Sequence, residues 1–135
     1  MMKKTYQLGQ VSGSAGLFST ASNLARFANY MLYPETQGVL PETIIESVLT
    51  EKRGNRGLGF QVYQDSEDCL ACGKSWPLGT FGHTGFTGTS LFVDPKEELV
   101  VIFLTNAVHF GRNTKIKEIR STLHSLIYSF YSKRS

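Results

Sequence analysis

"GTFGHTGFTGTSLFVDP" (residues 79–95) holds four glycines within a stretch that otherwise has the composition of β-strands. Glycine weakens the interior of a strand, and it usually marks a bulge or a place where a ligand or another backbone approaches closely. Two interpretations stay open on this evidence alone. The stretch is either a glycine-rich hairpin without a function or a strand that is kept open for a ligand.

The size and composition of the chain indicate one globular domain. Its 135 residues match the usual length of a domain, and the hydrophobic content of 41% suits a packed core. The net charge is only +3, and the basic residues occur as scattered pairs between acidic ones. This pattern is typical of a solvated surface and argues against a nucleic-acid-binding face.

The sequence shows no targeting segment. The basic start at Lys3 and Lys4 is followed by no apolar region, so it does not resemble a signal peptide. The longest apolar run, residues 99–104, is far shorter than the roughly 20 residues that cross a bilayer. The chain as it stands is therefore expected to be cytoplasmic and to have no membrane span.

Cys69 and Cys72 have the C-x-x-C spacing of half a zinc site or of a thioredoxin-like redox pair. Zinc normally takes four ligands, and the sequence holds no second cysteine pair. A redox pair is expected to open a helix after a strand, whereas this one lies in a polar, loop-like stretch. Two ordinary thiols are the favoured interpretation, with metal or redox chemistry as the alternative, and no cofactor is predicted.

Helical periodicity predicts three helices. The first begins near Ser19 or Thr20, either of which can act as N-cap, and is expected to end at Pro34. The second, within residues 40–52, starts near Pro41. The last has one apolar face, with Arg120 among the charged residues that point elsewhere. The predicted apolar faces are Leu24, Phe27, Ala28 and Met31; Ile44, Ile45, Val48 and Leu49; and Ile116, Ile119, Leu123, Leu126, Ile127 and Phe130.

Between these helices the period changes to two, which predicts strands. Residues 57–64 alternate Leu58, Phe60 and Val62 on one face against Gly59, Gln61 and Tyr63 on the other. Further strands are predicted at residues 81–84 and 89–93, followed by a turn at Pro95. Residues 99–105 are apolar on both faces, so they predict the central, doubly covered strand. The fold class is α+β, an antiparallel sheet packed against N- and C-terminal helices.

Two segments resemble a known superfamily. "GSAGLFSTASNLARFANYML" (residues 13–32) and "FGHTGFTGTSLFVDPKEELVVIFLTNAVHFGRN" (residues 81–113) are similar to the serine β-lactamase-like proteins, which include class C β-lactamases, penicillin-binding D,D-peptidases and related esterases. Three motifs make the active site of such enzymes: Ser-x-x-Lys, Tyr-x-Asn or Tyr-Ser, and Lys/His-Thr/Ser-Gly. His83, Thr84 and Gly85 match the third motif. The resemblance implies a partial fold of that kind, with relatives that are often exported.

The other two motifs are absent from the sequence. No serine is followed by a lysine three residues later, and no Tyr-x-Asn occurs. Tyr128-Ser129 and Tyr131-Ser132 lie in the terminal helix, after the third motif, where the family does not place its second one. The resemblance therefore implies that residues 1–135 are a single domain corresponding to the C-terminal segment of such a hydrolase.

The resemblance also implies roles for the residues around the third motif. The backbone N–H of Phe86 is the candidate oxyanion donor, Thr84 offers a hydroxyl to the substrate, and Gly85 lets substrate lie against the strand. His83 supplies a donor and an optional positive charge, while Phe86 and Thr87 shape the pocket wall. Each has a structural alternative, since Thr84 and Thr87 are ordinary strand residues and Gly85 and Gly88 suit a bulge. Weaker candidates are Asn106, His109, Arg112 and Asn113, and His124 is expected to be structural.

Two hypotheses of different classes follow. The first is the C-terminal segment of a serine hydrolase that acts on a small-molecule or peptide-like acyl substrate once a nucleophile-bearing part associates with it, and is inactive alone. The second is a non-catalytic binding module or homo-oligomer, because losing a helical portion exposes apolar surface that favours association.

Overall fold

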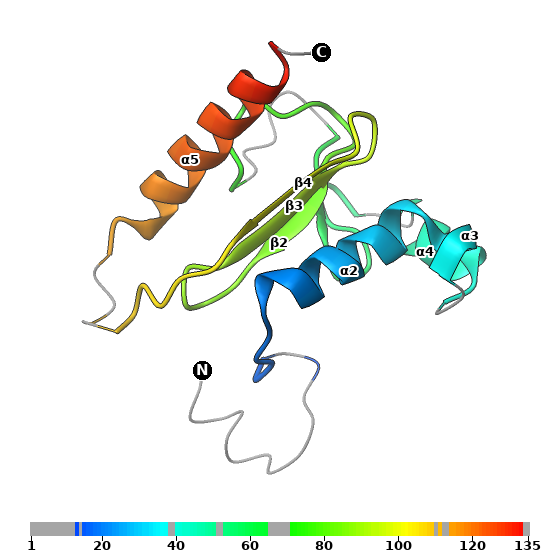
Figure 1. The fold of residues 1–135 in the computed structure, drawn as a ribbon, viewed down its shortest axis with the longest axis horizontal. Coiled ribbons are helices and arrows are strands. Elements are labelled where there is room, and N and C mark those ends of the chain that lie inside the picture. Colours follow the sequence, from blue (N-terminus) through cyan, green and yellow to red (C-terminus); the bar gives the residue numbers. More distant parts are fainter. Residues whose placement is uncertain are drawn as a thin grey trace.

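A computed structural model of the chain describes residues 13, 15–37, 40–50, 53–64, 71–109, 111 and 114–133. Its elements are α2 (Ala21–Leu32), α3 (Pro34–Gln37), α4 (Glu42–Thr50), β1 (Gln61–Val62), β2 (Phe81–Thr84), β3 (Ser90–Asp94), β4 (Leu99–Phe103) and α5 (Ile116–Tyr131). The strands form one antiparallel sheet in the order β1-β2-β3-β4. Figure 1 shows this sheet between α5 on one side and α2 on the other. The predicted α+β class is confirmed.

Helix α2 begins where the sequence predicts. The Oγ1 atom of Thr20 accepts a hydrogen bond from the backbone N–H of Asn23 at 3.2 Å, and Thr20 itself has extended backbone angles. This is the geometry of an N-cap, which pairs one of the N–H groups that a helix start leaves without an intrahelical acceptor. About two and three turns further on, Ala28 and Met31 are buried in the cluster between α2 and the sheet.

We expect Thr20→Ala to lower the free energy of unfolding by about 1 kcal/mol, because an N-cap hydroxyl is lost. Urea denaturation followed by far-UV circular dichroism measures the change. Ser19→Ala is the matched control, since Ser19 is exposed and next to the cap in the sequence. Equal losses for the two variants would show that the cap contributes nothing specific.

Pro34 does not act only as a helix stop. Helix α2 ends at Leu32, and Pro34 is the first residue of the four-residue helix α3. Proline is well suited to this position, because its fixed φ is helical and its missing N–H is one that the first turn leaves unpaired in any case. The predicted break is therefore present, but the chain resumes a helix at once.

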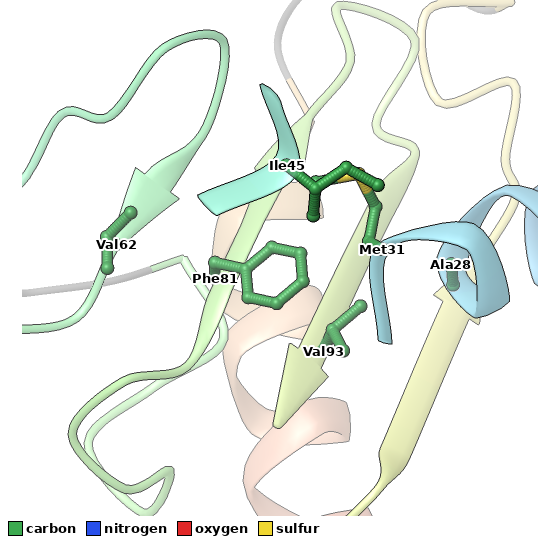
Figure 2. Packing of buried hydrophobic residues seen from close by; sticks show 6 residues of the cluster. All are labelled: Ala28, Met31, Ile45, Val62, Phe81 and Val93. Carbon is green, nitrogen blue, oxygen red and sulfur yellow. The ribbon is translucent and has the colours of Figure 1, made fainter. Parts of the chain in front are cut away.

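One hydrophobic cluster fills the space between the sheet and the helices α2 and α4 (Figure 2). Phe81 of β2 and Val93 of β3 point toward Met31 of α2 and Ile45 of α4. Phe60 packs edge-on against the ring of Phe81, with ring centroids 5.4 Å apart. The buried members are Ala28, Met31, Ile45, Val62, Phe81 and Val93.

A second cluster lies on the opposite face of the sheet, beneath α5. Its centre is Trp76, whose indole Nε1–H donates to the main-chain carbonyl of His124 at 3.1 Å. The His124 ring packs edge-on against Trp76 and Phe92, with centroid separations of 5.9 and 5.2 Å. The buried hydrophobic members are Tyr63, Cys72, Trp76, Phe92 and Val101. Helix α5 is thus held to the sheet largely by aromatic side chains.

The prediction that residues 99–105 form the central strand of the sheet is wrong. Strand β4 is the last of the four in the described sheet, whereas β3 lies between β2 and β4 and buries four of its five residues. An apolar composition indicates that both faces of a strand are buried, but it does not indicate which strands pair with its edges. The predicted strand at residues 57–64 is also reduced to Gln61–Val62, with Leu58 52% exposed and Tyr63 5% exposed, so the predicted alternation fails at both positions.

The predicted apolar face of α5 is only partly turned toward the sheet. Arg120 is 6% exposed and His124 is fully buried, whereas Ile119 is 53% and Leu126 is 64% exposed. Of the predicted face, Ile127 packs against the second cluster. The predicted helix is present. Arg120 and His124 nevertheless face inward, because Arg120 bonds to carbonyls of the turn between β2 and β3 and His124 bonds to Ser90 of β3.

Among the described residues, no helix combines the length and the apolar character that a bilayer crossing requires. The predicted extended lead-in at residues 1–10 lies outside the described residues.

Candidate functional site

Strand β2 carries the His-Thr-Gly motif at a place where the sheet opens. On one side, β1 pairs only with Phe81 and Gly82, the first two residues of β2. On the other side, β3 pairs with the whole strand, including His83 and Thr84. Within the described part of the chain, no strand therefore covers the outer edge of β2 at His83 and Thr84, although β2 is not the outermost strand.

The side chain of His83 is exposed at this open edge. Its Nδ1 atom lies 2.8 Å from the carbonyl oxygen of Thr84, and since a carbonyl only accepts, Nδ1–H is the donor. That hydrogen bond selects the tautomer with a proton on Nδ1, which leaves Nε2 as an acceptor while the ring is neutral. His83 is thus oriented by the backbone of its own neighbour in the strand, while its side chain remains exposed.

A tight turn follows the motif. The N–H of Gly88 donates to the carbonyl of Gly85 at 3.0 Å, and the N–H of Gly85 donates to the carbonyl of Thr89 at 2.8 Å. Phe86, at the tip, is 47% exposed, and Thr87 is half-buried. The turn therefore presents Phe86 directly beyond the open edge of β2.

The segment after β4 fixes this turn in place. The carbonyl of Thr87 accepts from the N–H of Ala107 at 2.8 Å and from the hydroxyl of Thr105 at 2.7 Å. Asn106 lies between those two residues and is exposed, and its carbonyl accepts from the N–H of His109 at 3.1 Å. The structure thus brings Asn106 beside the turn, while Arg112 and Asn113 lie outside the described residues.

Gly88 explains part of the glycine content. Its φ is +92°, and a Cβ built there would lie 2.5 Å from both Ile116 Cγ1 and Thr105 Oγ1 and 2.9 Å from Ala107 Cβ. A side chain is therefore excluded both by the backbone angle and by the packing of three residues from later in the chain. Gly82 is restricted by packing alone, since its Cβ would collide with Phe92 and the Leu91 carbonyl of the neighbouring strand.

Helix α5 supports the far end of the turn with Arg120, which lies one turn before His124. The Nη1 atom of Arg120 donates to the carbonyls of Gly88 and Thr89 at 3.4 and 3.5 Å. Burial lowers the pKa of the Arg120 guanidinium. Arg120 is among the charged residues that the sequence predicts to point away from the apolar face, and an arginine and a histidine four residues apart on one helix share a side. That spacing indicates a shared side of the helix, but it does not indicate that this side faces the sheet.

His124 forms a buried hydroxyl–imidazole pair. Its Nε2 atom shares a hydrogen bond of 2.9 Å with Ser90 Oγ, and Ser90 stands opposite Thr84 in the sheet. Burial, and secondarily the positive charge of Arg120, lowers the pKa of His124 from 6.5 to about 4. The imidazole is therefore neutral at pH 7, and His124 is buried among aromatic rings as a structural residue, as the sequence predicts.

Cys72 is buried in the second hydrophobic cluster, and Cys69 lies outside the described residues. Within the described ranges, no three His, Cys, Asp or Glu side chains come together as a metal site would require.

Comparison with known proteins identifies the family to which this arrangement belongs. The family model described as Beta-lactamase matches residues 2–124. The chain belongs to the beta-lactamase family. The resemblance found in the sequence to the serine β-lactamase-like superfamily is thereby confirmed, together with its α+β fold.

Individual members of the beta-lactamase family match over most of this chain but over a minor part of their own length. A protein of Escherichia coli O157:H7, provisionally named a D-alanyl-D-alanine carboxypeptidase, is 33% identical over 112 residues, which are 79% of this chain and 26% of that protein. A Salmonella gallinarum protein of the same provisional name gives the same figures. The crystal structure of a beta-lactamase from Mycobacterium bovis aligns with a TM-score of 0.55 and 26% identity, covering 79% of this chain and 45% of the other. The chain thus spans about a quarter of the curated relatives.

Proposed function

We propose that this chain forms the substrate-binding wall of a serine acyl hydrolase, which cleaves an amide or ester through a serine ester. The observation that supports this most is the open edge of β2 at His83 and Thr84, followed at once by an exposed turn. An extended acyl substrate can add to such an edge through backbone hydrogen bonds. Membership in the beta-lactamase family makes acyl transfer the chemistry that best fits this edge.

Each residue of the wall has a task in this proposal. The N–H of Phe86 donates to the carbonyl oxygen that becomes negative in the transition state. Thr84 donates its hydroxyl to a substrate carboxylate or carbonyl, and Gly85 lets the substrate approach the backbone. His83, held by the carbonyl of Thr84, contributes a donor when its ring is protonated. Thr87 and Asn106 border the same pocket beside the turn.

The nucleophile in this proposal comes from a polypeptide part outside these 135 residues. The sequence contains no Ser-x-x-Lys and no Tyr-x-Asn. Ser90 and His124 are close enough for a nucleophile and a base, but Ser90 is 3% exposed and His124 is fully buried, so no substrate reaches them. The chain alone is therefore inactive, and the complemented site takes a small-molecule or peptide-like acyl substrate.

The test supplies the missing part as a separate polypeptide, the N-terminal portion of the Escherichia coli relative, and follows acylation by a fluorescent penicillin. We expect Thr84→Val to slow labelling of the complex about 10- to 100-fold, because one hydrogen bond to a charged or polarised substrate group is lost. Thr114→Val is the matched control, since Thr114 is exposed and remote from β2 in the sequence. Unchanged labelling in Thr84→Val would refute the role of Thr84.

A non-catalytic binding or self-associating module is the second candidate, and exposed apolar side chains favour it. Leu17 is 90% and Phe18 is 98% exposed, immediately before α2. Large exposed apolar groups promote association. Light scattering after size-exclusion chromatography tests self-association, because a monomer mass at high protein concentration would argue against it.

A further inference from the structure

Arg120 is a buried positive charge that has no acidic partner within the described chain. Its side chain is 6% exposed, and its Nε atom is buried without a hydrogen-bond acceptor. Burial lowers the pKa of the guanidinium, and no described carboxylate acts in the opposite direction. A charge in a protein interior is normally paired, because taking it out of water is costly. Stability alone therefore does not account for an arginine at this position, since an apolar side chain of similar length avoids that cost.

The hydrogen bonds of Arg120 are made with the turn that follows the His-Thr-Gly motif. Its Nη1 atom donates to the carbonyl oxygens of Gly88 and Thr89 at 3.4 and 3.5 Å, so one group is shared between two successive carbonyls. The Thr89 carbonyl also accepts from the N–H of Gly85 at 2.8 Å. Arg120 is thus connected, through a single carbonyl group, to the residue directly before Phe86.

A second set of bonds fixes the same turn. The Thr87 carbonyl accepts from the hydroxyl of Thr105 at 2.7 Å and from the N–H of Ala107 at 2.8 Å. These bonds hold the residue after Phe86, whereas Arg120 acts on the residue before it. The direction of the Phe86 N–H depends on both sets, because peptide units are planar and the chain between two fixed neighbours can turn only about φ and ψ.

We propose that Arg120 is a positioning residue of the acyl-transfer site, which holds the N–H of Phe86 in the direction that an oxyanion requires. The inference rests on the proposed function, in which that N–H is the oxyanion donor. Such donors are effective because they are oriented before the reaction begins. A loosened turn therefore lowers the rate of acyl transfer more than it lowers the binding of substrate. Arg120 acts through the turn and not on the substrate, because its side chain is buried.

Three variants separate this task from a general contribution to folding. Arg120→Met removes the guanidinium and keeps a long, unbranched side chain. Arg120→Lys keeps the positive charge and a donor, but not the planar guanidinium. Lys117→Met is the matched control, because it removes a positive charge from the same helix at an exposed position.

Amide hydrogen exchange of the 135-residue chain, followed by NMR, tests the turn itself. We expect Arg120→Met to accelerate exchange of the Gly85 N–H about tenfold, because the Thr89 carbonyl that accepts from it is no longer held. The N–H of Tyr63 donates to the Thr80 carbonyl at 2.7 Å, outside the turn, and its exchange should stay close to that of the wild type. Arg120→Lys should retain most of the protection at Gly85, and the control variant all of it.

The kinetics of acylation test the consequence for the site. The complex with the N-terminal portion of the Escherichia coli relative is treated with increasing concentrations of a fluorescent penicillin. Arg120→Met should lower the acylation rate at saturating probe about tenfold, while the concentration that gives half of the maximal rate changes little. Arg120→Lys should recover part of the maximal rate, and Lys117→Met should match the wild type.

The proposal is overturned if Arg120→Met accelerates exchange at Gly85 and Tyr63 alike, because Arg120 then serves the fold as a whole. Unchanged exchange at Gly85, or a change in half-saturation without a change in the maximal rate, also overturns it. A wild-type complex that is not acylated refutes the proposed function and the oxyanion task with it, whereas the exchange result still decides whether Arg120 fixes the turn. Selective loss of protection at Gly85, with a lower maximal rate that lysine partly restores, supports the proposal.

Discussion

Replacement of Gly88 by alanine is expected to lower the free energy of unfolding by about 2–6 kcal/mol. About 1–3 kcal/mol arises from placing a residue with a Cβ at a φ of +92°. A further 1–3 kcal/mol, approximately, arises from overpacking, since the new methyl group lies 2.5 Å from Ile116 Cγ1 and Thr105 Oγ1. Urea denaturation at pH 7 measures the loss.

Gly79→Ala separates the two contributions. Gly79 has the same φ of +92°, but a Cβ built there meets nothing within 4 Å. This variant should therefore lose only the backbone share, about 1–3 kcal/mol. If Gly79→Ala is as destabilising as Gly88→Ala, the packing of Gly88 against Ile116, Thr105 and Ala107 contributes nothing to the loss, which contradicts this prediction.

The second large effect is a loss of stability in mild acid that depends on His124. The folded-state pKa of His124 is about 4, below the ordinary 6.5, so the unfolded chain binds more protons between these values. Stability contributed by the neutral imidazole is complete above pH 6.5, falls as the pH decreases and levels off near pH 4. At about 1.36 kcal/mol per pKa unit the total loss is about 3 kcal/mol. Denaturation midpoints measured from pH 7.5 to pH 4 give the slope.

Two glutamine substitutions assign that slope to one residue. His124→Gln removes the titrating group while keeping an amide that can pair with Ser90, and its stability should change little with pH over this range beyond the background of other groups. His83→Gln removes an exposed histidine and should retain the wild-type slope. A slope that persists in His124→Gln would place the acid-sensitive group elsewhere.

Local signals in the sequence predicted the structural features that depend only on residues close by in the chain. The Thr20 cap, the strand at residues 81–84 and the turn after Asp94 follow from side chains within three residues of each feature. Asp94 Oδ1 accepts from the N–H of Lys96 at 3.0 Å, which fixes the predicted turn. Such features need no knowledge of distant segments, because their hydrogen bonds close within the same few residues.

Long-range features were predicted less well. The apolar composition of β4 indicated burial, but its place at the end of the described sheet depends on which strands pair. The inward direction of Arg120 depends on carbonyls of Gly88 and Thr89, more than 30 residues earlier, and no helical period contains that information. The glycines of the candidate site were noted as unusual, yet the reason for Gly88 lies in Thr105, Ala107 and Ile116.

The proposal is that this chain supplies the substrate-binding wall and that another polypeptide part supplies the nucleophile. Its most direct test is the intact mass of the chain after treatment with a fluorophosphonate. We expect no adduct on the 135-residue chain alone. In the presence of the N-terminal portion of the Escherichia coli relative, we expect one adduct, on a serine of the added polypeptide. An adduct on a serine of this chain when it is treated alone, above all on Ser90 beside His124, would contradict the proposal.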